Sequence, residues 1–299
     1  MNPHAPFDYA EAFSRNLGWL TKSEQYALRN KRVAIAGLGG VGGYHLLALT
    51  RLGVGSFNLA EFDRFEVQNF NRQAGASVSC LGRTKLDVMV EMALDINPAL
   101  DLRTFPEGVT NETVNSFLAD VDAYADGLDF FAFNARRLTF QACDRLSVPA
   151  VTAAPLGMGA ALLTFMPGRM SFDEYFDLAS ATSEQELALR FLVGLSPAML
   201  QRHYLVDPSF VDFASGRGPS TVMACHICAG MLATEVLKLF VGRGRVRSAP
   251  WVTHFDAFEQ RLVRTWRPLG NRNPLQRLAM WVARRQLRTK FAVARVIPD

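Results

Sequence analysis

Short apolar runs alternate with longer amphipathic segments between residues 31 and 167 of this chain. The apolar runs have the composition of strands buried on both faces, and the segments between them are long enough for helices. This alternation predicts an α/β fold built on a Rossmann-like, doubly wound, mostly parallel sheet. Strands are expected at 33–36, 57–60, 122–125, 149–153 and 159–166.

The pattern changes on both sides of this region. Residues 8–30 are expected to form one or two helices, and Thr21 and Glu24 form a capping box before the second. From 171 to 205 helical spacing replaces the alternation, with Ser183 as the expected N-cap of an amphipathic run. The remaining elements are a long apolar helix at 221–241, a C-terminal antiparallel hairpin of strands at 251–255 and 261–266, and a basic helix at 275–290.

A glycine-rich loop, GLGGVGG, directly follows the first expected strand. Gly37, Gly39 and Gly42 fit the G-x-G-x-x-G spacing, which lets phosphate approach the backbone at a helix N-terminus. Glu61 ends the second strand, where an acid can accept the ribose hydroxyls of a nucleotide. The loop therefore predicts a nucleotide site, but glycines alone do not choose among NAD, FAD and S-adenosylmethionine.

Charged side chains around the same crevice narrow the choice. Arg72 lies in NFNRQ, Lys85 opens a helix, and Asp129 follows the strand expected at 122–125. Hydride transfer develops little charge near a pyrophosphate, whereas breaking a triphosphate develops negative charge on the phosphate oxygens. Arg and Lys offset charge on phosphate oxygens, and a carboxylate can hold a divalent metal. This set favours triphosphate chemistry.

The combined motifs resemble the ubiquitin-activating-like adenylyltransferases, which include ThiF, MoeB, HesA and the tRNA threonylcarbamoyladenosine dehydratases. The shared motifs are GLGGVG, the acid after the second strand, N-x-N-R-Q, G-x-x-K, I-N-P and the later Asp. The resemblance covers about 15–167 and returns at 224–242. It implies an ATP- and Mg²⁺-dependent enzyme that adenylates a carboxylate on a peptide, a protein C-terminus or a tRNA nucleoside.

The resemblance assigns roles by position. The residues that would contact ATP are Gly37, Gly39, Gly40, Gly42, Glu61, Asp63, Asn69, Arg72, Gln73 and Lys85. Asp129 would hold Mg²⁺, and Arg15 matches an arginine that the family lends across a dimer interface, so a homodimer is expected. Two positions depart from the family pattern: Glu61 stands where Asp is usual, and Phe130 stands where Asn is frequent.

On this reading the chain has three parts: N-terminal helices (1–30), an ATP-binding adenylation domain (31–266) and a basic C-terminal tail (267–299). Residues 171–218 would form a helical insertion over the substrate site. Residues 261–299 carry ten Arg or Lys and one acid, in a chain whose net charge is +4. The tail is either a solvated face or dimer contact, or a docking surface for an acidic partner, RNA or an anionic membrane.

Composition places further bounds on the chain. Its 299 residues are 49% hydrophobic and 20% charged, as in an ordinary globular protein. No apolar run suggests a membrane span, and residues 1–8 do not resemble a signal peptide. Four cysteines without such a signal indicate reduced thiols. We therefore expect a cytoplasmic protein that is not transmembrane.

The cysteines also bear on chemistry. Cys225 and Cys228 form a C-x-x-C pattern, but a second pair is missing, so no structural zinc is expected. No cysteine lies between 144 and 224, where thioester-forming relatives keep one. This predicts direct transfer of the acyl-adenylate to a final nucleophile. The rival interpretations are an NAD-dependent oxidoreductase and a non-catalytic nucleotide-binding module.

Overall fold

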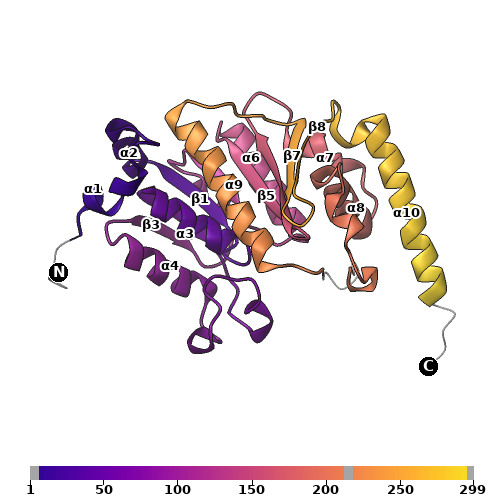
Figure 1. Ribbon diagram of the computed structural model, residues 1–299, viewed down its shortest axis with the longest axis horizontal. Coiled ribbons are helices and arrows are strands. Elements are labelled where there is room, and N and C mark those ends of the chain that lie inside the picture. The colour runs from indigo at the N-terminus through magenta and orange to yellow at the C-terminus, as the bar shows by residue number, and fades with distance from the viewer. Residues whose placement is uncertain (1–6, 212–217, 295–299) are drawn as a thin grey trace.

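The computed structural model describes residues 7–211 and 218–294, which build one eight-stranded sheet (Figure 1). The strand order is β3-β2-β1-β4-β5-β6-β7-β8. Five strands are parallel: β1 (Arg32–Ala36), β2 (Ser56–Ala60), β3 (Asp101–Phe105), β4 (Ala123–Asp126) and β5 (Ala150–Leu156). Three continue the sheet in antiparallel fashion: β6 (Gly159–Phe165), β7 (Trp251–Asp256) and β8 (Arg261–Trp266). The predicted fold class is confirmed.

Alternate strand residues feed two apolar cores, one on each face of the sheet. Val33 and Ile35 of β1 join one core, and Ala34 and Ala36 join the other. The first core is covered by α3 (Gly42–Leu52), α4 (Lys85–Ile96) and α9 (Val222–Val241). The second is covered by α5 (Val114–Phe117), α6 (Phe133–Arg145), α7 (Phe172–Phe176) and α8 (Glu184–Leu195). Helices on both faces explain the near-continuous apolar composition of β1.

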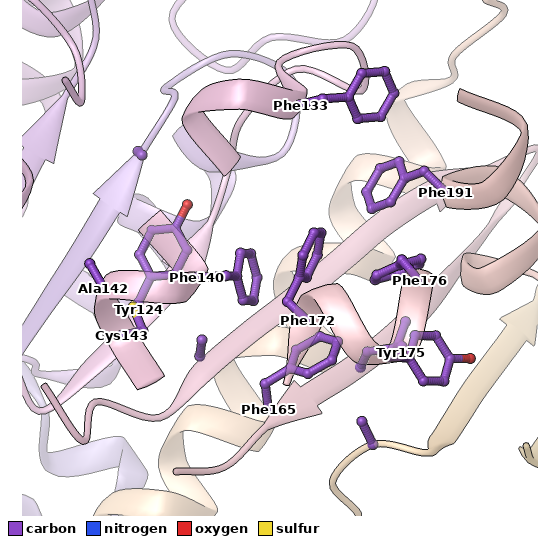
Figure 2. Close-up of a cluster of buried hydrophobic side chains, with 14 of the residues drawn as sticks. Tyr124, Phe133, Phe140, Ala142, Cys143, Phe165, Phe172, Tyr175, Phe176 and Phe191 are labelled. Carbon is purple, nitrogen blue, oxygen red and sulfur yellow. The ribbon is translucent and has the colours of Figure 1, made fainter. Parts of the chain in front are cut away.

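Aromatic side chains fill much of the second core (Figure 2). Phe140 of α6 stacks on Phe172 of α7 with ring centroids 4.2 Å apart. The ring centroids of Phe176 in α7 and Phe191 in α8 are 4.9 Å apart. Each such pair adds about 0.5–1.5 kcal/mol beyond its buried area. The helices of the expected insertion are therefore part of the hydrophobic core; a position over the substrate site stays a prediction.

The apolar helix α9 lies against β5, β6 and α3 (Figure 1). Among the described residues it is the one helix that is long and apolar enough to cross a membrane, by length and composition alone. Cys228, Leu232 and Val236 point into the first core. Packing against the sheet accounts for the apolar composition of that face.

The two ends of the chain lie at opposite ends of the molecule (Figure 1). The N-terminal part comprises α1 (Tyr9–Ala12) and α2 (Lys22–Arg29), and Thr21 and Glu24 form the predicted capping box. At the other end α10 (Pro274–Ala294) packs on α8, with Met280 beside Leu189 and Val193. The expected helix at 275–290 is thus confirmed and somewhat longer.

Candidate active site

The glycine loop joins β1 to α3 and is held by direct backbone contact. Gly37 has a φ of +81°, which favours glycine. A Cβ on Gly42 would collide with the carbonyl oxygen of Gly37, and a Cβ on Gly37 would collide with the backbone of Gly127. This packing places the loop against the segment after β4. Helix α3 begins directly after this loop, and a helix N-terminus is a favourable place for an anion.

Glu61 ties the end of β2 to the glycine loop. The side chain is buried, and its Oε2 accepts a hydrogen bond from the N–H of Leu38 at 2.8 Å. Its Oε1 accepts from the N–H groups of Phe62 and Asp63, both at 2.9 Å. A carboxylate has about four acceptor positions and three are used here, so one remains, on Oε2. Glu61 therefore shapes the loop and keeps one position that can accept a ribose hydroxyl, and its ribose role stays a prediction.

The NFNRQ turn lies along the other side of the loop. The stem of Arg72 lies beside Gly40, and its Nη1 donates to the Gln68 carbonyl at 3.0 Å. The Gln73 amide lies beside Gly39, and its buried Oε1 has no hydrogen-bond partner in the described structure. A buried acceptor without a donor is costly, which is consistent with a ligand at this position. The buried Asn69 orders the turn, because its Oδ1 accepts from the N–H of Glu66 at 2.9 Å.

Lys85 lies at the start of α4, next to the end of β2. Its Nζ donates to Asp63 Oδ2 at 2.9 Å. The Lys85 side chain is 8% exposed, whereas the Asp63 side chain is 54% exposed. Asp63, two residues after Glu61, thus holds the buried Lys85 ammonium, while the Asp63 carboxylate stays open to solvent.

The loop after β4 contains Asp129 and is held by a buried ion pair between Asp126 and Arg136. Asp126 accepts from Arg136 Nε at 2.9 Å, and these side chains are 2% and 3% exposed. The other nitrogens of Arg136 donate to the carbonyls of Leu128, Phe130 and Asp129. Arg136 therefore positions the segment that presents the exposed Asp129. Sequence reasoning missed Arg136, because a basic residue on an expected helix carries no motif.

The first turn of α9 completes the wall of the site. Buried Cys225 lies beside Gly40, and Asn71 Nδ2 donates to the carbonyl of Ser220 at 3.0 Å. Thr221 caps α9 and donates to the carbonyl of Gly157 at 2.8 Å. Sequence reasoning treated Cys225 as a core residue of an apolar helix. No local signal placed this helix start next to the glycine loop.

Arg15 lies away from the glycine loop of its own chain. It is exposed in a short 3₁₀ turn, Ser14–Asn16. The neighbouring Asn16 donates to the carbonyl of Leu52 at 3.1 Å, at the C-terminal end of α3. The glycine loop precedes the N-terminal end of the same helix, about 16 Å away along an 11-residue helix. Arg15 is therefore not brought to the glycine loop of its own chain.

Burial controls the titration of groups near the loop. His45 of α3 is fully buried, and burial lowers its pKa to about 3. Neither ring nitrogen has a hydrogen-bond partner among the described atoms. Burial also raises the pKa of the Cys225 thiol, although Ser220 and Arg72 act in the opposite direction. Both groups are therefore neutral at pH 7.

Asp129 fits the role of a magnesium ligand. One of its carboxylate oxygens accepts from the N–H of Phe131 at 3.0 Å, which orients the group. The described residues contain no cluster of three His, Cys, Asp or Glu that could hold a metal. Mg²⁺ commonly binds through one or two carboxylates together with substrate phosphates, so a single Asp beside the phosphate loop suits it.

A family model described as the ThiF family matches residues 13–278. The tRNA threonylcarbamoyladenosine dehydratase of Bacillus subtilis is 33% identical over 150 residues, or 50% of this chain and 57% of that enzyme. Protein HesA of Nostoc sp. is 28% identical over 66% of this chain and 84% of its own length. The ThiS adenylyltransferase of Escherichia coli is 31% identical over 48% of this chain and 56% of its own length. The chain thus spans little more than half of two of these relatives.

Solved structures share the fold. Escherichia coli MccB with ATP superposes with a TM-score of 0.63 at 19% identity, covering 87% of this chain and 73% of that one. PaaA superposes with a TM-score of 0.64 at 16% identity, covering 89% and 77%. Likeness at these identities concerns the fold alone.

Proposed function

Because this chain belongs to the ThiF family, as its motifs predicted, we propose that it is an ATP- and Mg²⁺-dependent adenylyltransferase. It would activate a carboxylate as an acyl-adenylate. The observation that supports this most is that Arg72 lies beside Gly40 of the glycine loop. Lys85 is paired with Asp63 after β2, and Asp129 lies in the loop after β4, so both are on segments that follow the two strands flanking β1. An oxidoreductase has no use for these charges beside a pyrophosphate, and a non-catalytic module has no use for a metal-holding carboxylate.

In the proposed reaction a substrate carboxylate oxygen attacks the α-phosphorus of ATP. The new bond joins that oxygen to phosphorus. The bond from the α-phosphorus to the bridging oxygen breaks, and its electron pair leaves with pyrophosphate. Negative charge grows on the phosphate oxygens, so the Arg72 guanidinium and the Lys85 ammonium lower the barrier. The start of α3 contributes backbone N–H donors.

Magnesium, when bound, neutralises phosphate charge and aligns the leaving group. Asp129 would hold it, and Arg136 keeps Asp129 in place through three backbone carbonyls. Glu61, already bonded to the loop, would accept the ribose hydroxyls. Gln73 and Asn69 would complete the nucleotide contacts, with Asp63 fixing Lys85.

The active form would be a homodimer with a composite site. Arg15 is exposed and lies at the far end of α3 from its own glycine loop. An arginine in that place can act on ATP only from a second copy of the chain. The dimer therefore follows from the role that the family pattern gives to Arg15.

The substrate would be a carboxylate on a peptide, a protein C-terminus or a tRNA nucleoside. Relatives named for tRNA threonylcarbamoyladenosine and for the sulfur carrier protein ThiS support this class. The basic tail remains a candidate docking surface for an acidic partner, RNA or an anionic membrane. Leu275, Leu278 and Trp281 are exposed on α10, so an apolar stripe accompanies its charge. We expect a cytoplasmic location.

Thermal-shift measurements distinguish the three functional classes. We expect ATP with Mg²⁺ to raise the melting temperature more than NAD does. Labelled pyrophosphate should exchange into ATP only when the true carboxylate is present. Stabilisation by NAD alone would support the oxidoreductase, and stabilisation by ATP without exchange across a panel of peptide, protein and tRNA carboxylates would support the binding module.

A further inference from the structure

A groove of about 430 Å³ lies between α9 and the β6–β8 strands, away from the glycine loop. Its floor includes three side chains in register across the strands. Leu162 of β6 pairs with Thr253 of β7, which pairs with Arg264 of β8. On α9 the groove begins at Ile227, which is turned about 200° around the helix from Cys225, beside the glycine loop, and it continues to Lys238. The groove therefore lies on a different face of α9 from the one next to the nucleotide site.

Three arginines that line the groove have no ion-pair partner among the described residues. Arg245 and Arg247 enter from the α9–β7 connection, and Arg264 enters from β8. None of the three forms an ion pair within the described ranges, whereas Lys238 is paired with the buried Glu235. Reduced solvation and the like charges of Arg245 and Arg264 lower the pKa of Arg247. Three guanidinium groups thus share one site without a counter-ion.

The groove is also apolar along α9. Ile227 and Met231 of α9 face Leu162 and Phe255 of the sheet, and all four side chains are only partly buried. The apolar surface continues to the sheet edge, where the side chain of Leu262, opposite Phe255, is 54% exposed. The size of the groove is within the range of small-ligand sites. The groove therefore has a positively charged part, formed by the arginines, and an apolar part along α9.

We propose that this groove binds an amphiphilic anion. A phosphate or carboxylate head group would lie among Arg245, Arg247 and Arg264, since planar guanidinium groups bind both anions through paired hydrogen bonds. The apolar body would lie along Ile227 and Met231. Arg247 already rests on the Trp251 ring, 4.9 Å from its centroid, which holds one guanidinium in place.

Calorimetric titration of the full chain with soluble amphiphiles tests the proposal. The probes are octyl phosphate and octanoate below their micelle concentrations, with octyl glucoside and inorganic phosphate as the uncharged and headgroup-only comparisons. We expect at least one octyl anion to bind tenfold or more tightly than both comparisons. Whichever anion binds more tightly identifies the head group.

Arg264→Ala and Arg247→Ala should each weaken that binding about tenfold or more. Arg103→Ala is the matched control, because Arg103 is an exposed arginine on the opposite edge strand, β3. The control should leave binding unchanged, and circular dichroism with melting temperatures should verify folding of every variant.

Equal binding by wild type and Arg264→Ala would overturn the proposal, as would octyl glucoside binding as tightly as the anions. Loss of binding in Lys85→Ala but not in Arg264→Ala would assign the anion to the nucleotide site instead. A wild-type dimer that binds neither anion and that Arg264→Glu dissociates would show that the groove is an interface between copies.

Discussion

Asp129 is exposed at the candidate site, with one oxygen held by the Phe131 N–H. Asp129→Asn keeps a side-chain oxygen for that hydrogen bond but removes the charge. We expect pyrophosphate exchange to fall by roughly two orders of magnitude or more, as is usual when a charge-stabilising group is lost. Asp95→Asn, an exposed acid on α4, is the control and should keep full activity. Full activity in Asp129→Asn would contradict the metal assignment.

His45 makes the stability of the folded chain depend on pH. Burial lowers its pKa to about 3, below an unfolded value of about 6.5, so the folded state resists protonation. The stability gained from keeping His45 neutral is fully present above pH 6.5 and is lost as pH falls toward 3. Between pH 7 and pH 5 this linkage removes about 2 kcal/mol from the free energy of unfolding.

Urea unfolding of wild type and His45→Leu at these two pH values measures the effect. The substitution replaces a neutral buried ring by an apolar side chain of similar volume. We expect the variant to lose less stability between pH 7 and pH 5 than wild type does. An identical pH dependence in both proteins would show that other groups dominate.

Cysteine chemistry is not expected in the proposed transfer. Cys143, Cys225 and Cys228 are buried, and burial raises the pKa of each thiol, which disfavours the reactive thiolate. A folded variant with Cys80, Cys143, Cys225 and Cys228 changed to Ser or Ala should still adenylate and turn over. A substrate adduct that thiols release, and that disappears with one cysteine, would contradict direct transfer.

At the scale of elements, the connection between β4 and α6 depends on one buried ion pair. Arg136→Ala would leave Asp126 buried without its partner and would free the carbonyls of the Asp129 segment. Breaking one side of a buried pair costs about 3–5 kcal/mol. We expect chemical denaturation to show a loss of this size, and adenylation to fall with it. Arg137→Ala, whose ion pair with Asp173 is more exposed, should lose less of both.

At the scale of the whole molecule, the composite site can be tested by subunit mixing. Arg15→Ala and Lys85→Ala chains should each be inactive as homodimers. A mixed dimer has one site with both groups, so mixing should restore up to about a quarter of wild-type activity. The measurement is pyrophosphate exchange after subunit exchange has been verified with tagged chains. No recovery in verified heterodimers would contradict the in-trans role of Arg15.

The sequence by itself determined four of the five parallel strands, the glycine loop and the family. The loop could be read because a backbone contact with Gly37, five residues earlier, requires glycine at Gly42, and because apolar strands carry a local period. It missed β3, because Asp101–Phe105 is an exposed edge strand that forms only by pairing with β2. The short, polar strand has too little apolar character to stand out.

Tertiary structure alone decided the placements that depend on distant parts of the chain. It brought Cys225 against Gly40, placed Arg136 under the Asp129 segment, and kept Arg15 away from its own loop. It also gathered Arg245, Arg247 and Arg264 in one groove, although the first two lie before β7 and the third lies in β8. The physical reason is that spacing along the chain fixes period and conformation, whereas packing of strands and helices fixes which separated side chains meet.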